Sequence, residues 1–204
     1  MKSPSRSVAG NSEGALQERL TAAQLARKNG DSELALQIYG ELRLRFPAEP
    51  APVLEAAKLM REAGRYEEAE LWLDAALERR PENTALLAER AWLAHDRRDW
   101  PEAERRWAVL RERFPGDPWG YFGGGRSLLA ARRVEEAETL LADAAERFPE
   151  NPGIAEGWAE CATRRGDWGE AAGKALGEVP RPRTRCSCGL CPGSGRPGLL
   201  AEGR

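Results

Sequence analysis

The chain is 204 residues long, with 41% hydrophobic and 31% charged residues, and its 31 basic and 33 acidic side chains leave a net charge of −2. This composition is typical of an ordinary globular protein and excludes the strongly basic balance of a nucleic-acid-binding protein. Residues 1–11 contain no apolar run, so we expect neither a secretory signal nor a membrane span. The expected location is therefore cytoplasmic, with no nucleic acid or membrane as a partner.

Two residue types recur every 34 positions along the chain. The prolines of this series are Pro47, Pro81, Pro115 and Pro149. The alanines are Ala35, Ala69, Ala103, Ala137 and Ala171. A constant period means that one supersecondary unit is copied along the chain and that each copy buries its apolar side against the next.

In chain order, the sequence predicts a disordered N-terminus over 1–11, a helical repeat array over 12–177 and a disordered tail over 178–204. The repeat units are expected at approximately 16–49, 50–83, 84–117, 118–151 and 152–177. These units account for most of the chain, so little is left for a second domain.

Each unit offers two amphipathic stretches that are joined by a turn and closed by a proline, which cannot continue a helix. The turns are Gly30-Asp31, Gly64-Arg65, Arg98-Asp99, Arg132-Arg133 and Gly166-Asp167. Glycine adopts the left-handed conformation that ends a helix at little cost, and aspartate accepts hydrogen bonds from the amides that begin the next helix. Where arginine replaces glycine, we expect a more strained turn.

The first helix of the fourth unit contains the run Gly123-Gly124-Gly125. A phosphate-binding loop should follow a strand and open a helix, and this run does neither. Three glycines cost a helix roughly 2–3 kcal/mol relative to alanines, so we expect close packing or the approach of a partner to compensate.

The first helices share a small residue, and the second helices share an alanine that is followed four residues later by a large side chain. The small residues are Ala23, Ala57, Ala91, Gly125 and Ala159. The large ones are Tyr39, Leu73, Trp107 and Leu141, and Ala175 departs from the pattern. The chain resembles the tetratricopeptide repeat family, bacterial type, over roughly residues 12 to 177. The resemblance implies an all-α fold, a right-handed α-solenoid of about five antiparallel helix pairs.

In that family the first helices line a concave groove that receives an extended peptide or a helix of another protein. Carried onto this chain, the resemblance places in the groove Gln24, Arg27, Lys58, Arg61, Trp92, His95 and Arg126. This strip is largely basic with one aromatic residue, which favours an acidic peptide or a chain terminus. The pattern by which chaperone-binding members hold a terminal carboxylate is absent, so chaperone binding is not expected.

No catalytic pattern stands out, and we expect no enzyme activity, no cofactor and no metal site. His95 is the only histidine, and its position matches that of Arg61 and Arg27, which predicts an exposed side chain. Cys161 lies on a repeat helix and is expected to be a buried, inert thiol. The weak candidates for zinc are Cys186, Cys188 and Cys191, which lack a fourth ligand.

From Gly177 onward, glycine, proline, arginine and cysteine replace the helical pattern. Either this tail is a genuine basic extension, or the reading frame has shifted near Ala172. Two functions therefore stay open. The chain is a non-catalytic scaffold that binds a partner in its groove, or it is the N-terminal recruiting region or a fragment of a larger glycan-modifying or sulfate-transferring enzyme. The second alternative rests on analogy with similar bacterial repeats.

Overall fold

The computed structural model describes residues 5–166, with side chains from Gly14 onward. Within this range the chain forms nine α-helices and no strand. They are α1 (Ser5–Lys28), α2 (Ser32–Arg45), α3 (Ala51–Glu62), α4 (Tyr66–Leu77), α5 (Thr84–Asp96), α6 (Trp100–Arg113), α7 (Trp119–Ala130), α8 (Val134–Arg147) and α9 (Pro152–Arg165). The prediction of an all-α fold is confirmed.

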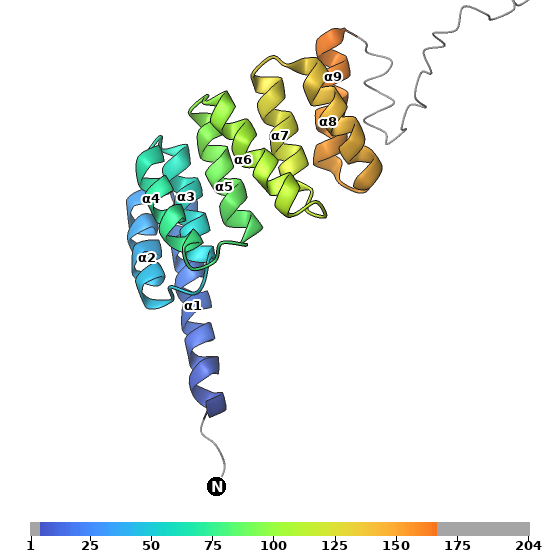
Figure 1. Ribbon diagram of the computed structural model, residues 1–204. Helices are drawn as coiled ribbons and strands as arrows, with labels where there is room; N and C mark the ends of the chain where they lie inside the picture. The colour runs from blue at the N-terminus through green and yellow to red at the C-terminus, as the bar shows by residue number, and fades with distance from the viewer. Residues whose placement is uncertain (1–4, 167–204) are drawn as a thin grey trace, which may run out of the picture.

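The helices follow one another in a single row, as Figure 1 shows from α1 in blue to α9 in orange. Each helix packs against the next one in sequence, and α3, α5, α7 and α9 also pack successively on one another. We call these odd-numbered helices, together with α1, the first helices, and the even-numbered ones the second helices. This arrangement is a helical-repeat solenoid, in which each unit contacts only its neighbours.

The start of α1 differs from the prediction. The helix begins at Ser5, inside the segment 1–11 for which the composition predicts disorder. Once a helical turn exists, each further residue adds one hydrogen bond, so a helix held by packing at one end extends into a polar segment. The N-terminal part of α1 accordingly projects beyond α2 and α3 in Figure 1. The tail over 178–204 lies outside the described residues.

The turns between first and second helices adopt the predicted left-handed conformation. Gly30, Gly64 and Gly166 have φ of 85°, 73° and 84°. Arg98 and Arg132 occupy the same conformation with φ of 60° and 63°. Because a Cβ atom disfavours this region by about 1–2 kcal/mol, these two turns are the strained ones, as the sequence predicts.

Aspartate and asparagine cap several helices through their side chains. Asp31 accepts from the backbone N–H of Leu34, and Asp99 accepts from that of Glu102. Asn83 and Asn151 cap α5 and α9 in the same way. These bonds satisfy amides that have no partner within the helix, so each unit restarts at a defined residue.

The repeated small residues lie where neighbouring helices meet. Ala23, Ala57 and Ala91 in the first helices are fully buried. In the second helices the recurring residues that are fully buried are Ala35, Ala69, Ala103 and Ala137, together with Tyr39, Leu73, Trp107 and Leu141. Small side chains at these points let the helix axes approach, and the large ones fill the space between units.

The glycine run in α7 is explained by close packing. A Cβ atom on Gly123 would collide with the ring of Trp107, and one on Gly125 would lie 2.5 Å from Cδ2 of Leu141. Gly124 faces Arg111 and Leu140 in the same manner. The absence of side chains on α7 therefore makes room for Trp107 of α6 and Leu141 of α8, which offsets the poor helix propensity of glycine.

Candidate functional site

The seven residues that the sequence places in the groove all lie on first helices. Gln24 and Arg27 are on α1, Lys58 and Arg61 on α3, Trp92 and His95 on α5, and Arg126 on α7. We call this set the first-helix strip. Because equivalent positions repeat with the period of the array, these side chains occupy corresponding places on successive helices.

Two arginines of the first-helix strip are held by carboxylates of the next unit. Arg27 donates to Glu62 at 2.6 Å and to Glu55 at 3.3 Å. One unit later, Arg61 bonds to Glu89 at 2.7 Å and to Asp96 at 2.5 Å. In both cases the acceptors follow the arginine by 28 and 35 positions. We call this arrangement the arginine clamp, and it joins α1 to α3 and α3 to α5.

The clamp changes the electrostatics that the sequence predicts for the strip. Arg27 and Arg61 are not free cations, because each already has two carboxylate partners. Glu89 is only 5% exposed, and burial raises the pKa of its carboxyl while Arg61 opposes that shift. The basic character of the strip therefore resides mainly in Lys58 and Arg126.

The clamp is interrupted at His95. The two positions that would supply its carboxylates are Gly123 and Ala130. His95 instead places Nδ1 at 2.9 Å from Oγ of Ser127, and the same oxygen accepts a hydrogen bond from the indole N–H of Trp107 at 3.0 Å. The side chain is half-buried, so the prediction of an exposed histidine is wrong. At this position the contact with α7 is therefore made by the ring of His95 and Ser127 instead of by an arginine and two carboxylates.

The surroundings of His95 favour its neutral form. Burial lowers the pKa of its imidazole below the usual range, Asp96 acts in the opposite direction, and Arg126 and Arg61 add to the lowering. Ser127 is only 2% exposed and already accepts from Trp107, so its hydroxyl is closed to a substrate. The serine–histidine contact is a packing hydrogen bond between α5 and α7.

Aromatic rings continue the strip from α5 to α7. Trp92 meets His95 and Phe122 edge-on, with ring centroids 5.0 and 6.1 Å apart, and it also contacts the buried Trp107 at 5.1 Å. Phe122 in turn meets Trp119 at 5.9 Å, and Trp119 is 47% exposed. We call Trp92, His95, Phe122 and Trp119 the aromatic cluster.

Sequence reasoning missed Trp119 and Phe122 as members of this surface. A signal was present, because these residues precede Arg126 by seven and four positions and so share its helical face. The cluster lies at the junction where the arginine clamp is interrupted. The strip therefore divides into an ion-paired part on α1 and α3 and an aromatic part on α5 and α7.

Lys58 and Arg126 flank Trp92 by one unit on either side. Lys58 contacts Glu55 at 2.8 Å, and Glu55 also pairs with Arg27. Arg126 contacts Glu160 at 3.9 Å, and Glu160 also pairs with Arg164 at 2.7 Å. Both cations can turn toward a ligand without leaving a carboxylate unpaired. Their side chains are 39% and 43% exposed.

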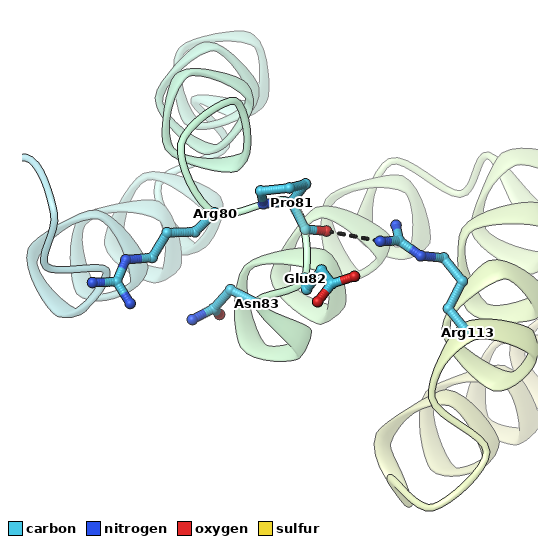
Figure 2. A pocket seen from close by; sticks show the side chains of 5 residues that line it. All are labelled: Arg80, Pro81, Glu82, Asn83 and Arg113. Atoms are coloured by element: carbon cyan, nitrogen blue, oxygen red, sulfur yellow. Dashed lines mark hydrogen bonds between the residues drawn. The ribbon is translucent and has the colours of Figure 1, made fainter.

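A hollow at the turn between α4 and α5 is lined by Arg80, Pro81, Glu82, Asn83 and Arg113. Figure 2 shows that the guanidinium group of Arg113 points toward the carbonyl of Pro81, whereas that of Arg80 points away from the turn. Arg113 donates to the carbonyl of Pro81 at 3.3 Å, and this bond ties the turn to the end of α6. We therefore assign the residues around this hollow to holding the turn, and we do not include them in the candidate site.

Metal ligands do not cluster in the part of the chain that the structure describes. Among these residues no group of three or more His, Cys, Asp or Glu side chains could hold a metal ion. Cys161 is buried and donates to the carbonyl of Gly157. Cys186, Cys188 and Cys191 lie outside the described residues. Over the same part of the chain, no helix is both long and apolar enough to cross a bilayer.

The stacked helix pairs, left-handed turns and small residues at the helix contacts define a helical-repeat protein of the solenoid class. Two family models described as tetratricopeptide repeat match residues 26–93 and 122–182, which together make up more than half of the chain. The chain therefore belongs to the tetratricopeptide repeat family. A search of the curated proteins finds no match to it.

Solved structures support the same fold at low sequence identity. A thermophilic TPR protein of Thermus thermophilus is 16% identical with a TM-score of 0.65, over 82% of this chain and 93% of that one. PilF of Pseudomonas aeruginosa is 13% identical with a TM-score of 0.63, over 82% and 76%. MamA of Desulfovibrio magneticus RS-1 is 17% identical with a TM-score of 0.58, over 84% and 97%. At these identities the likeness concerns the fold alone.

Proposed function

We propose that this protein is a non-catalytic scaffold that holds a peptide or helix of a partner protein in a concave groove lined by its first helices. The family implies a protein-interaction scaffold, and the groove is our assignment. The main support is that partly exposed aromatic rings lie on the same strip as Lys58 and Arg126. Aromatic residues and arginine are the side chains that most often dominate binding energy at interfaces.

The alternative of a recruiting region of a larger enzyme receives no support from the comparisons, since both matching family models describe the repeat itself. Within the described residues, the serine–histidine contact is closed to a substrate. We therefore retain the non-catalytic assignment. A cytoplasmic location and a protein as the partner, in place of a nucleic acid or a membrane, also remain our predictions.

The experiment has two stages, and the first identifies a partner by affinity capture and cross-linking mass spectrometry. The second measures binding of that purified partner to four variants. Trp119→Ala and Arg126→Glu alter the first-helix side. Their matched controls are Leu71→Ala and Arg79→Glu on the α4 side, where both side chains are exposed and Arg79 bonds to the carbonyl of Ala75.

We expect both first-helix variants to weaken binding and both controls to leave it unchanged. Circular dichroism melting should be similar in all four, because exposed side chains contribute little to stability. Loss of binding in the controls but not in the first-helix variants would reject the groove.

A further inference from the structure

Lys58, Trp92 and Arg126 form a row with a regular step. They occupy the same position in three successive units, on α3, α5 and α7. These three helices pack directly on one another in that order. Packed helices have axes about 8–10 Å apart, so the row presents a cation, an aromatic ring and a second cation at about that spacing.

A polyproline II segment matches this step better than the other regular conformations. It rises about 3.1 Å per residue with three residues per turn, so residues three apart face the same side about 9 Å from each other. In a β-strand, residues three apart face opposite sides. In an α-helix the same distance needs residues seven apart. The spacing of the row therefore favours a polyproline II ligand in which every third residue contacts the protein.

The two cations at the ends of the row are available for a ligand. When Lys58 leaves Glu55, that carboxylate keeps Arg27. When Arg126 leaves Glu160, that carboxylate keeps Arg164. Arg61, by contrast, would leave both Glu89 and Asp96 without a partner, and Arg27 would leave Glu62 without one. Charge complementarity thus calls for acidic side chains opposite Lys58 and Arg126 and not opposite the clamp.

The centre of the row is aromatic. Trp92 lies among His95, Phe122 and Trp107, and the neutral form of His95 leaves this part of the strip without a charge. Proline rings pack on aromatic surfaces, and a segment already in the polyproline II conformation loses little entropy on binding. An apolar residue, with proline preferred, suits the position between the two acids.

We propose that the strip binds an acidic, proline-rich segment in the polyproline II conformation, with the pattern acid-x-x-Pro-x-x-acid. The two acids lie opposite Lys58 and Arg126, and the central proline lies on Trp92. This inference rests on the proposed function, because it names the partner of the same face. It also specifies the spacing between the ligand's contact residues, three positions from each acid to the central proline. This spacing is the same in both chain directions.

The test uses the full chain and two synthetic peptides of equal composition. The matched peptide is acetyl-Glu-Pro-Pro-Pro-Pro-Pro-Glu-amide, and the shifted peptide is acetyl-Glu-Pro-Pro-Pro-Pro-Glu-Pro-amide. Isothermal titration calorimetry at low salt measures both affinities. We expect the matched peptide to bind at least about fivefold more tightly, because only its two carboxylates share one face of the polyproline II helix.

A charge-exchange experiment tests the row residue by residue. The double variant Lys58→Glu, Arg126→Glu should lose at least about tenfold in affinity for the matched peptide. The same variant should gain affinity for the peptide in which both glutamates are replaced by lysine. The control is Arg79→Glu together with Arg80→Glu, which changes the same number of charges at the end of α4.

The outcomes separate this inference from the proposed function. No binding of the matched peptide at millimolar concentration, or equal binding of the shifted peptide, overturns the acidic polyproline register. If an identified partner still depends on Trp119 and Arg126, the groove remains and only the register is wrong. A partner that presents contact residues seven apart in a helix likewise overturns the register and leaves the groove. If the double variant binds the lysine peptide more tightly than the wild type does, the result supports Lys58 and Arg126 as the residues that contact the two ends of the ligand.

Discussion

His95 is the residue at which the regular electrostatics of the array change. Its unit neighbours Arg27 and Arg61 hold carboxylates of the following unit, whereas His95 bonds to Ser127 beneath the aromatic rings. A charged imidazole there would add a third cation beside Arg61 and Arg126 and would have to donate to an oxygen that already accepts from Trp107. The fold therefore favours the neutral ring.

This preference predicts a stability that depends on pH. The pKa of His95 is lowered in the folded chain, so below about pH 6.5 the unfolded chain binds the proton first. Stability is fully present above that pH and falls as the pH drops toward the lower folded pKa. Urea unfolding of the wild type and of His95→Gln at pH 7.5 and 5.5 measures the effect.

The difference in unfolding free energy between the wild type and His95→Gln reports the contribution of His95 separately from that of other titratable groups. Glu89 acts in the opposite direction, because its raised pKa makes the folded chain bind a proton more readily as the pH falls. It is present in both proteins, so its contribution cancels. A stability difference that does not change between the two pH values would contradict the account of His95.

At the scale of the element, α7 is shaped by its neighbours and not by its own helix propensity. Its glycines make room for Trp107 and Leu141, and its exposed face carries Trp119 and Arg126. The same helix thus combines close packing against α6 and α8 with the most exposed ring of the aromatic cluster. A change in the packing of α7 is expected to move that cluster.

We predict that Gly123→Ala and Gly125→Ala each destabilise the protein by about 1–3 kcal/mol, because the new methyl group has no space against Trp107 or Leu141. The matched control is Gly14→Ala in α1, where nothing lies within 4 Å of the added Cβ. Alanine should stabilise that exposed helix by up to about 1 kcal/mol. Denaturant unfolding of the three variants distinguishes the two environments. A stabilising effect at Gly123 would show that α6 is not packed closely on α7, and one at Gly125 would show the same of α8.

The turns lead to a prediction of the opposite sign. Arg98→Gly relieves a left-handed conformation and should stabilise the protein by about 0.5–1 kcal/mol, after the greater entropy of glycine in the unfolded chain is counted. Arg97→Gly, one residue earlier at φ of −69°, should destabilise it, since no strain is relieved and contacts with Glu67 and Glu70 are lost. Thermal melting of both variants tests the assignment, which fails if the two change stability alike.

For the whole molecule, the arginine clamp couples one unit to the next. Arg61 joins α3 to α5 through Glu89, whose carboxylate is buried. Units of a solenoid contact only their neighbours, so stability depends on each interface in turn. The interruption of the clamp between α5 and α7, with rings in its place, makes that junction different from the preceding ones.

We predict that Arg61→Ala destabilises the protein by about 2–3 kcal/mol, because Glu89 is left buried without its cation. This loss of stability should be smaller than the loss on breaking a fully buried ion pair, because Arg61 is partly exposed. Arg27→Ala is the matched control and should cost below about 1 kcal/mol, because Glu55 keeps Lys58 and Glu62 is exposed. Hydrogen exchange should show faster opening of α3 and α5 in Arg61→Ala alone, and equal losses in both variants would reject the role of Glu89.

Much of this fold was predictable because its determinants are local or periodic. The prolines, the turn glycines and the buried alanines recur with the unit, so their places follow from the sequence alone. The pairing of Arg61 with Glu89 and Asp96 depends on the offset between packed helices. Although its 28 and 35 residue spacing is visible in the sequence, only the structure shows which charges meet. The contact of Trp92 with Phe122 likewise depends on how closely α5 packs on α7.

The measurement that tests the groove most directly is the response of the tryptophan indole N–H signals in NMR when a purified partner is added. Trp92 and Trp119 belong to the aromatic cluster on first helices, whereas Trp72 lies on the second helix α4 beneath Arg43. We predict that the signals of Trp92 and Trp119 shift on binding while that of Trp72 stays in place. A shift of Trp72 with unchanged Trp92 and Trp119 would place the partner on the second helices and contradict the proposed groove.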